Sequence, residues 1–182
     1  MASNRTGGCP CGTVRYTLTA PPLVVNCCHC NLCKKQTGVA FTTNIIIEAS
    51  HFVLDLSTPP LLSVAVDTPS GNGQLRKHCP KCLTCVVSEY GGSFGGPFIQ
   101  YVKIGTLDPE FQAGIRPDAF VFVKEKLNWI GLPEGARAFP EFYDFAKGGV
   151  WSEESIKRRE KLLPQINEWV EKGEKFKVGE IY

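Results

Sequence analysis

Cys9-Pro10-Cys11-Gly12 and, about seventy residues later, Cys79-Pro80-Lys81-Cys82 are the two short stretches that decide how this chain folds. Proline and glycine favour tight turns, and a tight turn can aim two sulfur atoms at one metal ion. Four thiolates from two such turns make the closed tetrahedral set of a structural zinc site. We therefore expect these cysteines to join the start of the chain to a later hairpin.

A further group of cysteines lies in Cys28-His29-Cys30-Asn31-Leu32-Cys33. Three protein ligands leave one coordination position open, which distinguishes catalytic zinc sites from structural ones. Because three thiolates give the zinc ion a net negative charge, the site suits binding of a substrate thiolate better than activation of water. The pattern favours sulfur chemistry on a small thiol or thioether. The alternative is a second structural zinc, completed by Cys27 or His29.

The length and composition indicate what class of protein contains these sites. The chain has 182 residues, enough for one domain with an appendage, and an odd number of cysteines, nine. Its start carries no apolar leader, so we expect a cytoplasmic protein with reduced thiols rather than disulfides. No apolar run is long enough to cross a membrane. The net charge of +2 and the lack of a long basic tract argue against nucleic-acid binding.

Alternating apolar and polar residues predict a mainly β protein up to about residue 129. In the first of the predicted strands, Val14, Tyr16 and Leu18 share one face. We expect antiparallel strands with short connections, and one short helix at Asn31–Thr37 that ends at Gly38. The predicted strands are residues 13–19, 23–26, 41–48, 52–56, 61–66, 74–78, 86–90, 99–104 and 120–123.

The C-terminal part of the chain has a different pattern. Ser152-Glu153-Glu154 is typical of a helix start, apolar residues then recur at helical spacing, and Lys172-Gly173 predicts the end. Pro164 should kink or divide this helix. We expect residues 134–182 to form a helical extension packed on a domain of residues 1–133. A helix that forms a homodimer is the alternative.

Other residues near the clusters have less specific patterns. Cys27 is a further thiol beside the three-cysteine group, and Cys85 extends the second turn toward an iron–sulfur pattern whose fourth cysteine is absent. His29 and Tyr101 are weak candidates for a general acid or base. Basic residues near the clusters could meet the carboxylates of an acidic thiol; these are Lys34, Lys35, Arg76, Lys77 and Lys103.

The ordered motifs together resemble those of the glutathione-dependent formaldehyde-activating enzyme family, which includes the centromere protein V-like proteins. The resemblance covers about Gly7 to Pro133 and leaves the tail outside. Its strongest parts are Gly7 to Tyr16, Cys28 to Gly38, Arg76 to Cys82 and Val102 to Asp108, followed by Lys126 and Trp129.

This resemblance implies a β-tent of small antiparallel sheets stapled by two zinc ions. It implies a structural zinc on Cys9, Cys11, Cys79 and Cys82, and a catalytic zinc on Cys28, Cys30 and Cys33. It also implies a carbon–sulfur lyase that joins glutathione and formaldehyde reversibly, giving S-(hydroxymethyl)glutathione. A glutathione conjugate of a larger metabolite is an equally compatible substrate. The alternative is a non-enzymatic zinc module that binds other proteins.

Overall fold

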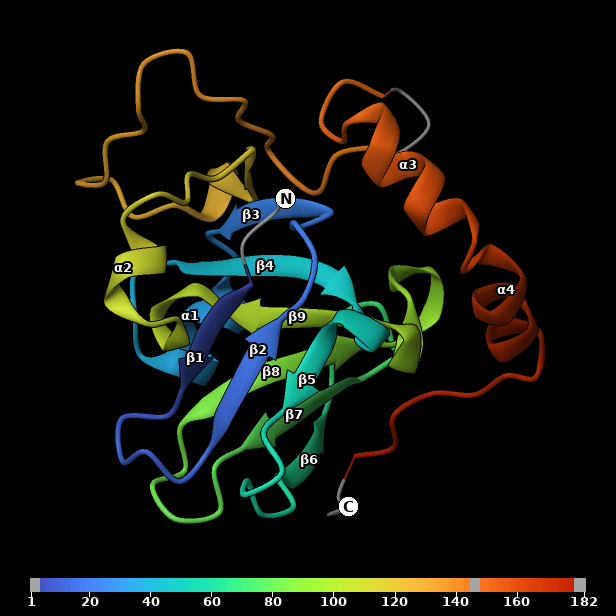
Figure 1. Ribbon diagram of the computed structural model, residues 1–182. Helices are drawn as coiled ribbons and strands as arrows, with labels where there is room; N and C mark the ends of the chain where they lie inside the picture. The colour runs from blue at the N-terminus through green and yellow to red at the C-terminus, as the bar shows by residue number, and fades with distance from the viewer. Residues whose placement is uncertain (1–3, 145–147, 179–182) are drawn as a thin grey trace.

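The computed structural model describes residues 4–144 and 148–178 (Figure 1). Two β-sheets form most of it, and the helical tail lies along one side. The smaller sheet has the strand order β1-β2-β5 and the larger one the order β10-β3-β4-β9-β8-β7-β6. The strands are β1 (Arg5–Gly8), β2 (Arg15–Leu18), β3 (Val24–Cys28), β4 (Thr42–Glu48), β5 (Phe52–Leu54), β6 (Leu62–Val66), β7 (Gln74–His78), β8 (Cys85–Tyr90), β9 (Ile99–Lys103) and β10 (Ala119–Val121).

Short helices lie between the strands and at the end of the chain. Four are α-helices and five are single 3₁₀ turns within the described ranges. They are α1 (Asn31–Thr37), η1 (Ala49–His51), η2 (Gly92–Phe94), η3 (Gly96–Phe98), η4 (Ile104–Thr106), α2 (Pro109–Gln112), η5 (Val123–Glu125), α3 (Glu153–Glu160) and α4 (Leu163–Glu171). The mainly β class with C-terminal helices is therefore confirmed.

The main core lies between the two sheets. Tyr16 and Leu18 of the small sheet are fully buried there with Val14, against Ile45 and Val87 of the large sheet. The predicted face of the first strand is thus confirmed. A bidentate ion pair between Arg15 and Asp108, at 2.8 and 2.6 Å, fixes the small sheet to the segment after β9.

Two features of the sheets differ from the sequence-based prediction. β1 was not predicted, because its sequence, Arg5-Thr6-Gly7-Gly8, has no apolar alternation. A Cβ atom on Gly7 would collide with the Thr106 carbonyl and the Tyr16 hydroxyl, so close backbone approach requires glycine here. The expectation of wholly antiparallel strands was wrong, because β10 runs parallel to β3. The two strands are far apart in the chain, with α1 and the strands from β4 to β9 between them, and a parallel pair needs such a crossover rather than a hairpin.

The tail forms two helices, as the proline predicted. Ser152 caps α3 by accepting a hydrogen bond from the Ser155 amide, and Pro164 lies in the first turn of α4. Arg158 of α3 donates to both carboxylate oxygens of Glu48 in β4, at 2.8 and 2.5 Å. Ile166 of α4 is buried in a second core with residues of β3, β4 and β9. The division of the chain into domains at residues 133 and 134 stays a prediction.

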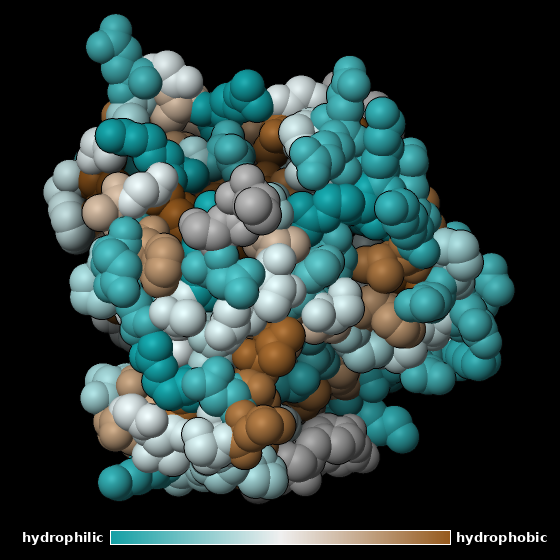
Figure 2. All heavy atoms as spheres, viewed as in Figure 1, coloured by the Kyte–Doolittle hydropathy of each residue, from teal (hydrophilic) through white to brown (hydrophobic). Residues whose placement is uncertain are grey.

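The surface seen in Figure 2 is mainly hydrophilic, and hydrophobic residues show as scattered groups, some between the tail helices and the sheets. None of the helices in the described ranges has the length and apolar character needed to cross a bilayer.

Candidate metal centres

The first candidate centre joins two distant turns. Cys9 and Cys11 lie in the turn between β1 and β2, and Cys79 and Cys82 lie in the turn between β7 and β8. Their four sulfur atoms all lie within 4.8 Å of one another. The Sγ atoms of Cys9 and Cys11 are 3.4 Å apart, and those of Cys11 and Cys79 are 3.7 Å apart. The structure thus brings together the four residues that the sequence predicted.

These distances fit a tetrahedral zinc ion. Zinc–sulfur bonds of about 2.3 Å place the sulfur atoms about 3.8 Å apart at the corners of a tetrahedron. Amide groups of the turns point at two of the sulfurs, from Val14 to Cys9 at 3.3 Å and from Cys82 to Cys79 at 3.5 Å. Such amides stabilise thiolates, so the four cysteines could hold a zinc ion without rearrangement.

The second candidate centre lies at the end of β3. Cys28 is its last residue, Cys30 is the N-cap of α1, and Cys33 lies in the first turn of that helix. The Sγ atoms of Cys28 and Cys33 are 3.6 Å apart, and all three sulfurs lie within 4.8 Å of one another. The Cys33 amide donates to the Cys30 sulfur at 3.3 Å. Gly38 ends α1 in the left-handed conformation, with φ of 70°.

The closeness of the three thiols opposes ionisation of all three together. Hydrogen bonds from Cys28 and Cys33 lower the pKa of Cys30 to about 3. Hydrogen bonds with Cys30 and Cys33 raise the pKa of Cys28 strongly, and burial adds to this. For Cys33, the hydrogen bond with Cys28 acts to lower the pKa, but the one with Cys30 and burial together raise it to about 11. One negative charge is thus shared, and a divalent cation would remove the conflict.

A cavity of about 440 Å³ lies over the three-cysteine centre. It separates this centre from the four-cysteine one, whose residues line none of the three main cavities in the described part of the chain. The cavity is lined by Cys28, Cys30 and Cys33 together with Asn26, Asn31, Leu32, Asn44, Ile46, Thr68, Pro69, Ser70, Tyr90, Phe94, Tyr101, Val121, Phe122, Glu125 and Phe142.

Two residues beside the ligands point elsewhere. Neither Cys27 nor His29 belongs to the group of sulfurs within 4.8 Å, and neither lines the cavity. The His29 Nε2 atom instead lies 3.7 Å from the Cys27 sulfur, and its ring contacts the rings of Phe41 and Phe120. Burial raises the pKa of Cys27 to about 11 and lowers that of His29. This pair is therefore a buried structural contact in the described structure.

The other candidates from the sequence lie in different places. Cys85 is partly buried outside both sulfur groups, with its Sγ atom 3.6 Å from the Val87 carbonyl. Tyr101 lines the cavity, but its hydroxyl donates to the Phe94 carbonyl at 3.0 Å. Lys103 donates to Asn44 at 2.7 Å. None of the five basic residues singled out in the sequence lines the cavity.

Sequence patterns did not reveal Tyr90 or the other aromatic residues of the cavity. Burial raises the pKa of Tyr90 well above its usual value, and the charges of Cys33 and Cys28 add to this. Its phenol therefore stays protonated and keeps a hydrogen-bond donor, and Tyr90 lines the same cavity as the three cysteines. The position of Tyr90 at the end of a strand was predicted, but no local pattern linked it to the cysteines of β3 and α1.

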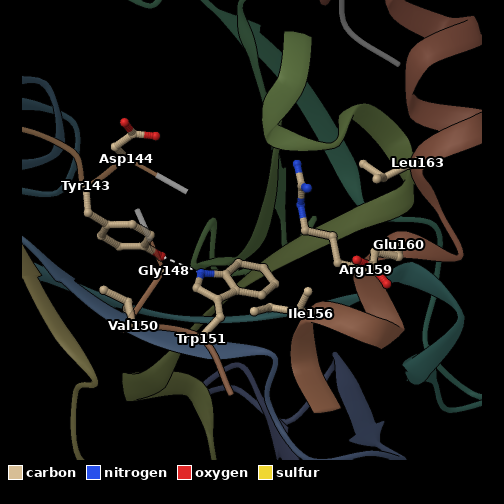
Figure 3. Close-up of a pocket in the computed structure, with 9 residues that line it drawn as sticks. All are labelled: Tyr143, Asp144, Gly148, Val150, Trp151, Ile156, Arg159, Glu160 and Leu163. Atoms are coloured by element: carbon tan, nitrogen blue, oxygen red, sulfur yellow. Dashed lines mark hydrogen bonds between the residues drawn. The ribbon is translucent and has the colours of Figure 1, made fainter. Parts of the chain in front are cut away.

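A smaller cavity of about 160 Å³ lies between α3 and the chain around Tyr143 and Trp151 (Figure 3). The Trp151 indole Nε1 donates to the Tyr143 hydroxyl at 2.8 Å. The same hydroxyl accepts a hydrogen bond from Asn26 at 3.1 Å, and Asn26 lines the cavity over the three-cysteine centre. This small cavity has no cysteine among the residues that line it, so it supports the wall of the cavity over the three cysteines rather than the chemistry.

Fold and site together define a mainly β protein with two cysteine centres that could each hold a metal ion, one of them open to a cavity. The family model described as glutathione-dependent formaldehyde-activating enzyme matches residues 4–125, and the chain belongs to this family. A crystal structure of a Rhodobacter sphaeroides protein is similar at 16% sequence identity, covering 64% of this chain and 99% of that chain, with a TM-score of 0.43. No curated protein matches the chain.

Proposed function

We propose that the chain is a zinc-dependent carbon–sulfur lyase, or a related thiol-addition enzyme, that acts in the cytoplasm on glutathione and a small electrophile or on a glutathione conjugate. The family description supports the use of glutathione. The observation that carries the proposal is the contrast in access between the two centres: the three sulfurs of Cys28, Cys30 and Cys33 open into a cavity, whereas four sulfurs form a closed set elsewhere.

The two centres then have different tasks. Cys9, Cys11, Cys79 and Cys82 would hold a structural zinc, and Cys28, Cys30 and Cys33 a catalytic one. The second ion, when bound, supplies the positive charge that keeps a substrate thiol ionised at neutral pH. The cavity favours an enzyme over a non-enzymatic interaction module, because an interaction module needs no enclosed space beside its metal ligands.

The residues of the cavity account for the remaining steps. In the addition direction, a sulfur–carbon bond forms while the carbonyl π bond opens, and the carbonyl oxygen takes up a proton. Tyr90 would donate a hydrogen bond to this oxygen as its negative charge develops. The aromatic walls make the surroundings of that interaction less polar and so strengthen it. In the reverse direction, the same oxygen loses its proton as the sulfur–carbon bond breaks.

We also propose that residues 134–182 form the helical extension of a domain spanning residues 1–133. The match to the family model ends at residue 125, which supports a boundary in this region. Phe142, from beyond the boundary, lines the cavity, and Arg158 and Ile166 contact the sheet. The extension would thus add one wall to a site whose metal ligands all lie in the domain.

Replacement of Cys30 tests the function. We expect the Cys30→Ser variant to fold, to hold one zinc per chain instead of two, and to lose nearly all glutathione-dependent turnover of formaldehyde. Cys27→Ala is the matched control, because Cys27 lies beside the ligands but outside the sulfur group, and it should keep both ions and activity. Zinc content, circular dichroism and turnover are measured together. A Cys30→Ser variant that loses one zinc and keeps full activity would contradict the catalytic role.

A further inference from the structure

The cavity over the three-cysteine centre has aromatic walls. Five rings line the space beside the three sulfurs: Tyr90, Phe94, Tyr101, Phe122 and Phe142. They come from separate parts of the chain, namely β8, η2, β9, the residue after β10 and the segment before the tail helices. Rings contributed by five separate segments form an enclosure rather than one flat patch.

These rings support one another in fixed positions. Phe94 meets Phe142 edge to face, with centroids 5.3 Å apart and planes at 89°. Tyr90 meets Tyr101 in the same way at 4.6 Å and 65°. Such edge-to-face pairs are favourable contacts that hold aromatic walls in place. The enclosure is thus formed before any ligand enters.

The described walls of the cavity bring no cationic side chain to a ligand. Among the described residues that line it there is no lysine, arginine or histidine, and the one acidic residue, Glu125, accepts a hydrogen bond from the Asn31 amide at 2.5 Å. Glutathione carries two carboxylates and an ammonium group, and burying such charges without partners is costly. Its charged ends therefore suit the mouth of the cavity, and the group attached to its sulfur suits the interior.

The size of the interior exceeds what a hydroxymethyl group needs. Two heavy atoms fill roughly 60 Å³, judged from the volume of about 30 Å³ that each water molecule occupies in the liquid. The cavity measures about 440 Å³, which is in the range of sites for complete small molecules. A single carbon on the sulfur would leave the aromatic walls in contact with water.

We propose that the cavity receives an aromatic ring carried on the carbon that bonds to sulfur. This inference rests on the proposed function and names its substrate class: a thiol and an aromatic aldehyde, or the hemithioacetal that they form. In the addition, the sulfur–carbon bond forms, the carbonyl π bond opens, and the thiol proton ends on the new hydroxyl group. The ring remains unchanged and packs against Phe94 and Phe142.

Stable thioethers of glutathione test this inference by calorimetry on the zinc-loaded protein. S-benzylglutathione should bind about tenfold or more tightly than S-methylglutathione, because burial of a ring removes far more apolar surface from water than burial of a methyl group. It should also bind more tightly than S-hexylglutathione, whose flexible chain loses rotational freedom on binding. Equal or tighter binding of either of the other two overturns the inference and leaves the proposed function standing.

Substitution of a wall residue shows where the ring binds. Phe94→Leu should reduce the affinity for S-benzylglutathione by about fivefold and leave that for S-methylglutathione unchanged. Phe111→Leu is the matched control, because Phe111 is a partly buried phenylalanine that does not line the cavity. Equal losses in both variants would overturn the inference.

A third outcome separates the inference from the function. If no glutathione thioether binds, the choice of glutathione in the proposed function is overturned. The binding of two simple thiols, benzyl mercaptan and ethanethiol, then tests the aromatic site without glutathione. Tighter binding of benzyl mercaptan that Phe94→Leu abolishes supports the ring site, and equal binding of the two thiols overturns it.

Discussion

The two cysteine centres contain the same ligand atom in different surroundings. The four-cysteine centre lies in two turns, one from each sheet, and its Cys9 and Cys79 are buried in the main core. The three-cysteine centre joins a strand end to a short helix and faces a cavity. The type of ligand is therefore not what distinguishes a structural site from one that can bind a substrate. The two differ in the number of sulfurs and in the space beside them.

The largest expected effect concerns the closed centre. Cys79→Ser should cost several kcal/mol of the free energy of unfolding, because zinc binding at such sites is coupled to folding. A fall of about 10 °C or more in the melting temperature follows for a chain of this size. Cys85→Ser, in the same hairpin but outside the sulfur groups, is the control and should melt near the parent. A Cys79→Ser protein with unchanged melting would show that the fold does not depend on this centre.

Metal removal should separate the two centres. The three-cysteine centre has one ligand fewer and opens into a cavity, so a chelator should take its zinc first. Samples taken during dialysis are compared for zinc content, turnover and circular dichroism. We expect activity to vanish when one zinc per chain is gone while the β-sheet signal remains. Loss of fold before loss of activity would reverse the roles that we assign.

A smaller effect is expected at Tyr90. Tyr90→Phe removes the hydroxyl that would stabilise negative charge on the substrate oxygen, so kcat should fall about 10- to 100-fold, with little change in KM. Tyr101→Phe is the matched control, since the Tyr101 hydroxyl is bound to the Phe94 carbonyl. Equal effects of the two substitutions on kcat would remove the special role of Tyr90.

The smallest expected effect concerns the ion pair that supports the N-terminal turn of the closed centre. The Arg15 guanidinium, helped by Thr6, lowers the pKa of Asp108 to about 2. Because this pKa is below the unfolded value of about 3.9, the pair stabilises the fold above pH 4, and the stabilisation is lost as the pH falls toward 2. Arg15 is partly exposed, so solvent screening limits the gain to about 1 kcal/mol.

Melting curves of the parent and Asp108→Asn check this prediction. The variant should melt about 2 to 4 °C lower from pH 8 to pH 5, and the difference should shrink near pH 3. A difference that grows on acidification would contradict the assigned direction. Comparison of this variant with Cys79→Ser shows how much the metal centre and the ion pair each contribute to holding β1 and β2 on the rest of the fold.

Local sequence patterns predicted the parts of the molecule that depend on local chemistry. The bounds of α1 and of β7 agree with the prediction, and Pro164 separates α3 from α4. The structure also brings seven of the cysteines together as one group of four and one group of three, as their spacing indicated. Turn formers, helix caps and alternation all act over a few residues, which is why a single sequence reveals them.

The missed features depend on contacts between distant segments. β1 forms because β2 pairs with it, although Gly7 and Gly8 give it no strand pattern. Parallel pairing of β10 with β3 depends on a crossover, not on the strand itself. Phe94 and Phe142 lie in segments without periodic pattern, and they meet only in the folded chain. The character of the cavity, and with it the substrate class, could not be predicted from local patterns.

The central claim is that one centre is closed and the other is open to a substrate sulfur. X-ray absorption at the zinc edge tests it most directly on protein that contains two zinc ions per chain. With four and three sulfur ligands, we expect about 3.5 sulfur neighbours per zinc on average, rising to about 4 when glutathione is added. An average of 4 before addition, or no change after it, would contradict the account.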